Sequence, residues 1–165
     1  MKIDVVAFGK IKSPGLRQSA DYYKKLSSKY SDIQEIECKP APVFDKSNSS
    51  FTNAQNIEAD RIEKYLEKFP RSKIIAMDED APSRKTKDWS VIAEELESLG
   101  TSPLVFLVGS SVGIHSKILD KAAHRISLGS QTISHELARV VLFEQIYRML
   151  TVINNHPYHH EGKTL

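Results

Sequence analysis

The sequence predicts an α/β fold with a mainly parallel sheet between helices. Short runs rich in Val, Ile, Leu and Phe recur along the chain, and segments with helical apolar spacing separate them. Strands that alternate with helices form parallel sheets, because each crossover helix returns the chain to the same end of the sheet. Several runs are continuously apolar, which is typical of strands buried on both faces.

The length and composition suit a single domain over residues 1–165. A chain of 165 residues can bury a core, and 40% hydrophobic with 27% charged residues is ordinary for a globular protein. The net charge of +2 permits a nucleic-acid partner without pointing to one. The single cysteine, Cys38, allows no intramolecular disulfide and suits a reducing cytoplasm. No nucleophile motif surrounds Cys38, and a half-buried strand position accounts for it.

Membrane association is not expected from the pattern of apolar residues. No run approaches the ~20 apolar residues that span a bilayer. The apolar run at the N-terminus is too short for a signal peptide and is typical of a first strand. We therefore expect a cytoplasmic protein.

The first half of the chain alternates between strands and helices. Residues 2–9 predict a buried strand that ends at a glycine, residues 16–30 an amphipathic helix, and residues 33–38 an alternating strand. Residues 39–56 are rich in Pro, Ser, Asn and Lys without a clean period, which predicts a loop or insertion. Residues 57–68 predict a helix that Pro70 stops, and residues 73–77 a third buried strand.

The second half continues the alternation. Residues 86–99 predict a helix with Gly100 as its C-cap, and residues 103–108 a continuously apolar strand. A short helix over 116–124, a short strand over 126–128 and a long helix over 134–153 complete the pattern. Residues 154–165 form a tail with an aromatic residue and several histidines, which we interpret as functional.

Ligands of parallel sheets bind beyond the carboxyl ends of the strands, which points to the loops at 77–82, 109–113 and 129–134. The small residues of 109–113 let the backbone approach a ligand, although the segment is neither a phosphate-binding loop nor a dinucleotide fingerprint, and a tight turn is the alternative. Ser134 or Thr132 can cap the last helix. Asp78 and Asp80 are metal-ligand types, but acids are also common in turns after strands.

The last helix and the tail hold further candidate residues. Arg148 lies four residues after Glu144, so an intrahelical ion pair is the alternative to a chemical role. His156, His159 and His160, with Asp78 or Asp80, would be the ligands of a metal-dependent hydrolase. Their spacing matches no structural zinc pattern.

The C-terminal third contains a specific motif, L-x-x-x-T-x-x-H-x-LARV-x-L-x-EQ-x-YR followed by PYH. It comprises Leu128, Thr132, His135, Leu137, Ala138, Arg139, Val140, Leu142, Glu144, Gln145, Tyr147, Arg148, Pro157, Tyr158 and His159. With this motif, its first strand and Met77-Asp78, the chain resembles the ribosomal large subunit methyltransferase H family of SPOUT methyltransferases. The resemblance covers nearly the full length, and its middle part is the least specific.

The resemblance implies a C-terminal trefoil knot, a homodimer and S-adenosylmethionine as the methyl donor. It further implies methylation at N3 of a pseudouridine in 23S ribosomal RNA of the large subunit or the assembled ribosome, without a metal. The residues implied to bind the cofactor are Met77, Asp78, Gly109, Ser110, Gly113, Leu128, Gly129, Ser130, Gln131, Thr132, Ile133 and Ser134.

The resemblance places Arg148, Tyr158 and His159 at the target base, where their chemistry suits methylation of an imide nitrogen. Arg148 can stabilise negative charge on the base oxygens. His159 can accept or orient a proton, and Tyr158 can stack on an unstacked base. Basic residues near the site could form an RNA-binding patch: Lys10, Lys12, Arg17, Lys24 and Lys25.

Two positions depart from the family pattern. Ser110 stands where the family usually has a second glycine, and Ser134 stands where it tends to have proline. A side chain at position 110 would tighten the cofactor pocket. That departure motivates an alternative function, a non-catalytic protein of this fold that binds RNA or the ribosome.

Overall fold

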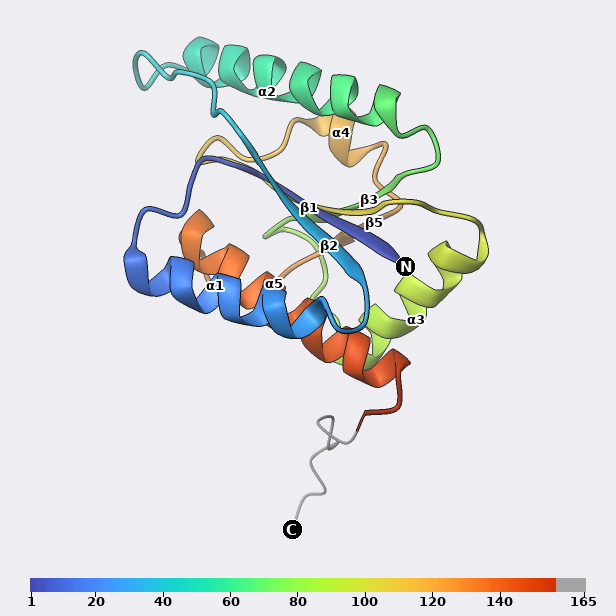
Figure 1. Cartoon of the computed structure of the whole chain (residues 1–165). Coiled ribbons are helices and arrows are strands. Elements are labelled where there is room, and N and C mark those ends of the chain that lie inside the picture. The colour runs from blue at the N-terminus through green and yellow to red at the C-terminus, as the bar shows by residue number, and fades with distance from the viewer. Residues whose placement is uncertain (157–165) are drawn as a thin grey trace.

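The structure, a computed structural model, describes residues 1–156. A parallel sheet lies between two layers of helices (Figure 1). Within these residues the sheet has five strands in the order β2-β1-β4-β3-β5. The strands are β1 (Lys2–Phe8), β2 (Asp32–Cys38), β3 (Lys73–Met77), β4 (Leu104–Val108) and β5 (His124–Ile126). All their pairings are parallel, so the predicted α/β class with a mainly parallel sheet is confirmed.

Helices cover both faces of the sheet, as Figure 1 shows. They are α1 (Pro14–Ser27), α2 (Asn48–Lys68), α3 (Thr86–Ser98), α4 (Ser116–Leu119) and α5 (His135–Ile153). Side chains alternate between the faces of a strand, so Val5 and Phe106 pack under α1, α3 and α5, whereas Val6 and Leu107 pack under α2 and α4. Burial on both faces explains why the central strands are continuously apolar. No helix of the described chain is long and apolar enough to cross a membrane.

The prediction of a loop over residues 39–56 is wrong from residue 48 onward, because α2 begins at Asn48. The side chain of Ser47 caps the helix by accepting a hydrogen bond from the backbone N–H of Ser50 at 3.2 Å. Ala54 is fully buried in the first half of α2. Polar residues conceal the helical period there, and packing against the sheet decides the conformation.

The short strand β5 lies two residues earlier than expected, at His124–Ile126, and α4 ends at Leu119. The backbone N–H of Ala123 donates to the carbonyl of Ile74 at 2.8 Å, and this bond aligns β5 with β3. Backbone pairing with a neighbouring strand, rather than apolar side chains, therefore fixes the start of β5.

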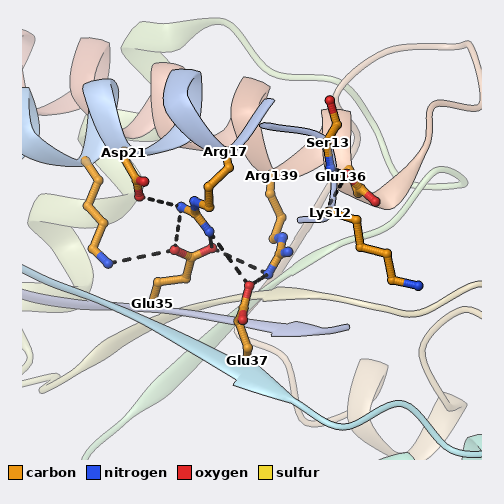
Figure 2. Close-up of polar contacts among 9 residues, drawn as sticks. Lys12, Ser13, Arg17, Asp21, Glu35, Glu37, Glu136 and Arg139 are labelled. Carbon is orange, nitrogen blue, oxygen red and sulfur yellow. Dashed lines mark hydrogen bonds and ion pairs between the residues drawn. The ribbon is translucent and has the colours of Figure 1, made fainter. Parts of the chain in front are cut away.

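A buried ion-pair network joins α1 and α5 to β2 (Figure 2). Arg139 of α5 is fully buried, and its Nη1 lies 3.1 Å from Glu37 Oε1 and 3.4 Å from Glu35 Oε1. Arg17 of α1 bonds Glu35 Oε2 at 2.8 Å, and Lys24 Nζ lies 3.7 Å from the same oxygen. Arg17 and Lys24, two members of the predicted basic patch, are thus engaged within the fold.

Candidate functional site

A cavity of about 620 Å³ lies where the carboxyl ends of β3 and β4 meet the segment after β5. Every residue predicted to bind the cofactor lines this cavity except Ser130. Those that line it are Met77, Asp78, Gly109, Ser110, Gly113, Leu128, Gly129, Gln131, Thr132, Ile133 and Ser134. The fold therefore brings together three loops that are far apart in the sequence, and the volume is ordinary for a small-molecule site.

Several lining residues were not expected from the sequence. Gln55 reaches the cavity from α2, in a stretch predicted to be a loop, and Arg125 reaches it from β5. His135 and Ala138 line the cavity from the first turn of α5. His135 belongs to the motif on which the resemblance rests, so the sequence could have indicated it as a lining residue. No sequence pattern indicates Gln55, because its position depends on packing between α2 and the loop after β4.

The loop of residues 109–113, which we call the 109–113 loop, forms one wall of the cavity. A Cβ at Gly109 would lie 2.9 Å from Ile114 Cγ1 and 3.1 Å from the carbonyl carbon of Gly113. Gly113 has a φ of +74°, a conformation that favours glycine. The backbone N–H of Gly113 donates to the carbonyl of Ser110 at 3.0 Å and closes the turn. The chain here passes so close to itself that position 109 has no room for a side chain.

The side chain of Ser110 is bound to α2. Its hydroxyl donates to Glu58 Oε2 at 2.8 Å, and the other carboxylate oxygen accepts the backbone N–H of Ala41 at 2.9 Å. Glu58 is only 3% exposed, and burial raises the pKa of its carboxyl group, while the two hydrogen bonds and the charge of Arg61 lower it. Glu58 is not among the lining residues of the cavity. The serine that replaces the family's glycine therefore has a structural partner outside the cavity.

The acidic turn after β3 is fixed by its own contacts. Arg125 Nε donates to Asp78 Oδ2 at 2.8 Å, and the backbone N–H of Asp80 donates to Asp78 Oδ1 at 3.2 Å. Within residues 1–156, no three His, Cys, Asp or Glu side chains are grouped so that they could hold a metal ion. Asp78 thus closes a turn and pairs with β5, while Glu79 and Asp80 line the cavity beside it.

The segment after β5 runs from a tight turn into a capped helix. Ser127 Oγ donates to the carbonyl of Gly129 at 2.6 Å, and Gly129 has a φ of +149°. Thr132 Oγ1 donates to Glu79 Oε2 at 3.1 Å and ties this segment to the acidic turn. The side chain of Ser134 accepts the backbone N–H of Leu137 at 3.3 Å, which confirms Ser134 as the N-cap of α5.

Of the residues predicted to face the target base, the structure describes Arg148, which does not line the cavity. Arg148 forms the intrahelical ion pair with Glu144 that the sequence offered as an alternative. It lies ten residues along α5 from Ala138, about 15 Å at 1.5 Å per residue. Tyr158 and His159 lie outside the described residues, as does His160, while the ring of His156 packs edge-on against Tyr30.

Comparison with known proteins agrees with this architecture. A family model described as predicted SPOUT methyltransferase matches residues 1–159. Proteins named ribosomal RNA large subunit methyltransferase H are similar over nearly their whole length. The one from Mesoplasma florum is 33% identical over 96% of this chain and 99% of its own, and one from Carboxydothermus hydrogenoformans is 33% identical over the same shares.

Solved structures support the fold alone. A probable methylase family protein from Haemophilus influenzae aligns with a TM-score of 0.54 at 12% identity, over 96% of this chain and 70% of that one. The family model and the relatives cover the strands, the three loops and α5 together. On this evidence, the chain belongs to the SPOUT methyltransferases, among the ribosomal RNA large subunit methyltransferase H proteins.

Proposed function

We propose that this protein transfers a methyl group from S-adenosylmethionine to N3 of a pseudouridine in 23S ribosomal RNA. The large subunit or the assembled ribosome in the cytoplasm would be its substrate. The observation that supports this most directly is the cavity beyond β3 and β4, which is lined by residues that the resemblance to the family assigns to the donor. The names of the relatives support the class of RNA.

The chemistry of the cavity suits the donor. A Cβ at Gly109 would meet Ile114 and Gly113, so glycine is needed for the tight turn that forms this wall of the cavity. Glu79 and Asp80 supply carboxylates that suit a cationic ligand with hydroxyl groups, while Asp78 is paired with Arg125. S-adenosylmethionine supplies an activated methyl group on a positively charged sulfur. The remaining task of the protein is to align the base with this methyl group and to exclude water.

The base end of the site is assigned to Arg148, Tyr158 and His159. The N3 of a pseudouridine becomes a good nucleophile only when its proton leaves and negative charge spreads to the ring oxygens. In this proposal His159 accepts that proton, because imidazole titrates near neutral pH. Arg148 stabilises the oxygen charge with two parallel donors, and Tyr158 stacks on the base.

The position of Arg148 supports a homodimer. Within one chain it lies about 15 Å along α5 from the cavity-lining Ala138, because a helix rises 1.5 Å per residue. A rigid helix cannot shorten that distance. We therefore propose that Arg148 of one protomer serves the cavity of its partner, in a dimer of knotted SPOUT domains.

The proposed function is tested by mass spectrometry of 23S ribosomal RNA from cells with and without this protein. We expect the loss of one methyl group from one pseudouridine when the protein is absent, and its return when the gene is restored. An unchanged modification pattern would contradict the proposal. The non-catalytic alternative is separated from it by calorimetry with S-adenosylmethionine, because only the enzyme needs to bind the donor.

A further inference from the structure

The 109–113 loop contacts α2 at two points, although α2 lies outside the motif that carried the resemblance. Ser110 Oγ donates to Glu58 Oε2 at 2.8 Å. Gln55 Nε2 donates to the carbonyl of Val112 at 2.6 Å. Gln55 and Glu58 are three residues apart on α2, a spacing that places both on the same side of a helix. One face of α2 therefore holds both the beginning and the end of this loop.

Two hydrogen bonds within the loop add to these contacts. The backbone bond between Gly113 and Ser110 closes the turn, and the backbone N–H of Val112 reaches Ser110 Oγ at 3.3 Å. The Ser110 hydroxyl thus accepts from its own loop while it donates to Glu58. Removing the hydroxyl would break both interactions and leave the bond from Gln55 to Val112 to hold the loop to the helix.

Glu58 is built into the fold as a fixed acceptor. It is 3% exposed, and its second oxygen accepts the backbone N–H of Ala41 at 2.9 Å, in the segment that leads from β2 to α2. A buried carboxylate with two hydrogen bonds cannot turn away from either donor without leaving a buried polar group unsatisfied. The fixed carboxylate of Glu58 therefore fixes the position of the Ser110 hydroxyl.

We infer that Glu58 and Gln55 are positioning residues that hold the 109–113 loop in its binding conformation and so set the affinity for the adenosyl donor. The inference rests on the proposed function, because it assigns the donor to this cavity. In this inference Ser110 supports donor binding instead of tightening the cofactor pocket. The serine is the point at which α2 holds the loop, where a glycine would offer no such contact.

The test compares Ser110→Ala and Gln55→Ala with Glu63→Gln, a control on the same helix whose carboxylate bonds Lys117 and Lys121 instead. Hydrogen exchange of the loop amides is measured in the free protein, and S-adenosylmethionine affinity by calorimetry. We expect faster exchange of the loop amides in both test variants. Donor binding should weaken by about five- to tenfold, as expected for one lost hydrogen bond to a buried group. The control should match the wild type.

A conservative substitution separates positioning from the need for a negative charge. In Glu58→Gln, the amide oxygen can still accept from Ala41 and the amide nitrogen can donate to Ser110 Oγ, whereas Glu58→Ala loses both contacts. We expect Gln to retain most of the donor affinity and Ala to lose it. Since Glu58→Ala could also unfold the protein, Ser110→Ala and Gln55→Ala remain the decisive variants.

The possible outcomes are distinct. Unchanged loop exchange in both Ser110→Ala and Gln55→Ala would overturn the inference. Faster exchange with unchanged donor affinity would also overturn it, because the loop would then be held for another reason. If the wild-type protein binds no S-adenosylmethionine, the proposed function fails, and the exchange data still decide whether α2 holds the loop.

Discussion

Arg139 and Glu37 are 102 residues apart in the sequence, yet Arg139 Nη1 donates to Glu37 Oε1 at 3.1 Å. The arginine side chain is fully buried, whereas Glu37 is 28% exposed. Burying a guanidinium costs free energy that nearby carboxylates must offset. Arg139 lies four residues after His135, the first residue of α5, so this ion pair fixes the end of α5 that lines the cavity.

We predict that Arg139→Met lowers the free energy of unfolding by about 1.5–3 kcal/mol, the range for a hydrogen bond to a charged group. Glu37 loses its partner at 3.1 Å, while Glu35 keeps Arg17. Urea unfolding measures the change. Adding Glu37→Gln to the same chain should recover part of the loss, since one unpaired charge is then removed. Lys121→Met is the control, because an exposed ion pair contributes at most about 1 kcal/mol. An equal effect of Arg139→Met and Lys121→Met would contradict the importance of the buried network.

Gly109→Ala tests the close approach within the 109–113 loop. The new methyl group would lie 2.9 Å from Ile114 Cγ1, so the loop must shift. We expect S-adenosylmethionine affinity to fall about tenfold or more, or about 1.4 kcal/mol. The matched control is Gly15→Ala, where an added Cβ meets no heavy atom within 4 Å. Calorimetry should show normal donor binding in Gly15→Ala, and normal binding in both variants would refute the steric explanation.

The pKa of Glu58 predicts a pH dependence of stability. Burial raises this pKa above its ordinary value of 4.5, against the opposing charge of Arg61. The folded protein then binds the proton more tightly than the unfolded chain. Stability from this group is therefore present below pH 4.5 and is lost as the pH rises through the folded-state pKa. Burial also raises the pKa of the neighbouring Cys38 above 9.0, so that thiol does not titrate in the same range.

Glu58→Gln removes this titration and serves as the reference. On acidification from neutral pH toward 4.5, the wild-type protein should gain stability relative to Glu58→Gln. Urea unfolding of both proteins at a series of pH values measures the difference between their free energies of unfolding. The titrations of all other groups are common to both proteins and cancel in this difference. A constant difference across the series would show that the pKa of Glu58 is the same in both states.

Arg148→Ala and His159→Ala should each reduce methylation at least about a hundredfold while donor binding is kept, as expected for groups that act mainly in the transition state. Glu144→Gln, which releases Arg148 from its ion pair, is the control for a purely structural role. Wild-type turnover in both alanine variants would show that the assignment is wrong.

Mixed dimers test whether Arg148 acts across the proposed interface. Co-expression of Arg148→Ala with Gly109→Ala gives heterodimers that contain one intact site only if Arg148 serves its partner's cavity. With the donor kept below the weakened affinity of Gly109→Ala, both parent homodimers are impaired, and we therefore expect faster methylation in the isolated heterodimer than in either parent. An inactive heterodimer would place Arg148 in the site of its own chain.

Lys10 and Lys12 are better candidates for RNA contact than Lys24. Both are exposed and follow Gly9, where an added Cβ would lie 3.6 Å from Nε2 of the cavity-lining His135. Reversal of both lysines to Glu should weaken binding to the large subunit and reduce its salt dependence by about one unit of slope per lost phosphate contact. Lys64→Glu, on the opposite helical layer, is the control. Equal effects at all three positions would indicate non-specific charge attraction.

Most of the fold was predictable from the sequence because its central strands are buried on both faces. Residues 74–77 of β3 and all of β4 are apolar, and the loops that follow them contain the small and acidic residues of the cavity. The rule that ligands bind beyond strand ends selects the loops that line the cavity. The resemblance to the family then assigned individual residues of these loops to the donor.

Three features depend on contacts between distant segments and could not be predicted. The start of α2 depends on packing and on the cap at Ser47, since the residues there have weak helical preference. The burial of Arg139 depends on its bond to Glu37, and no sequence pattern in α5 indicates that partner. The link from Glu58 to Ser110 joins a helix and a loop that are 52 residues apart.

The strand order has a consequence for how the chain is made. β4 lies between β1 and β3, although it is synthesised after both. While the ribosome is still translating the residues before β4, the nascent β1–β2 pair and β3 have no strand in common, and their edges stay open to other chains. Stable folding must therefore wait until Val108 has left the exit tunnel.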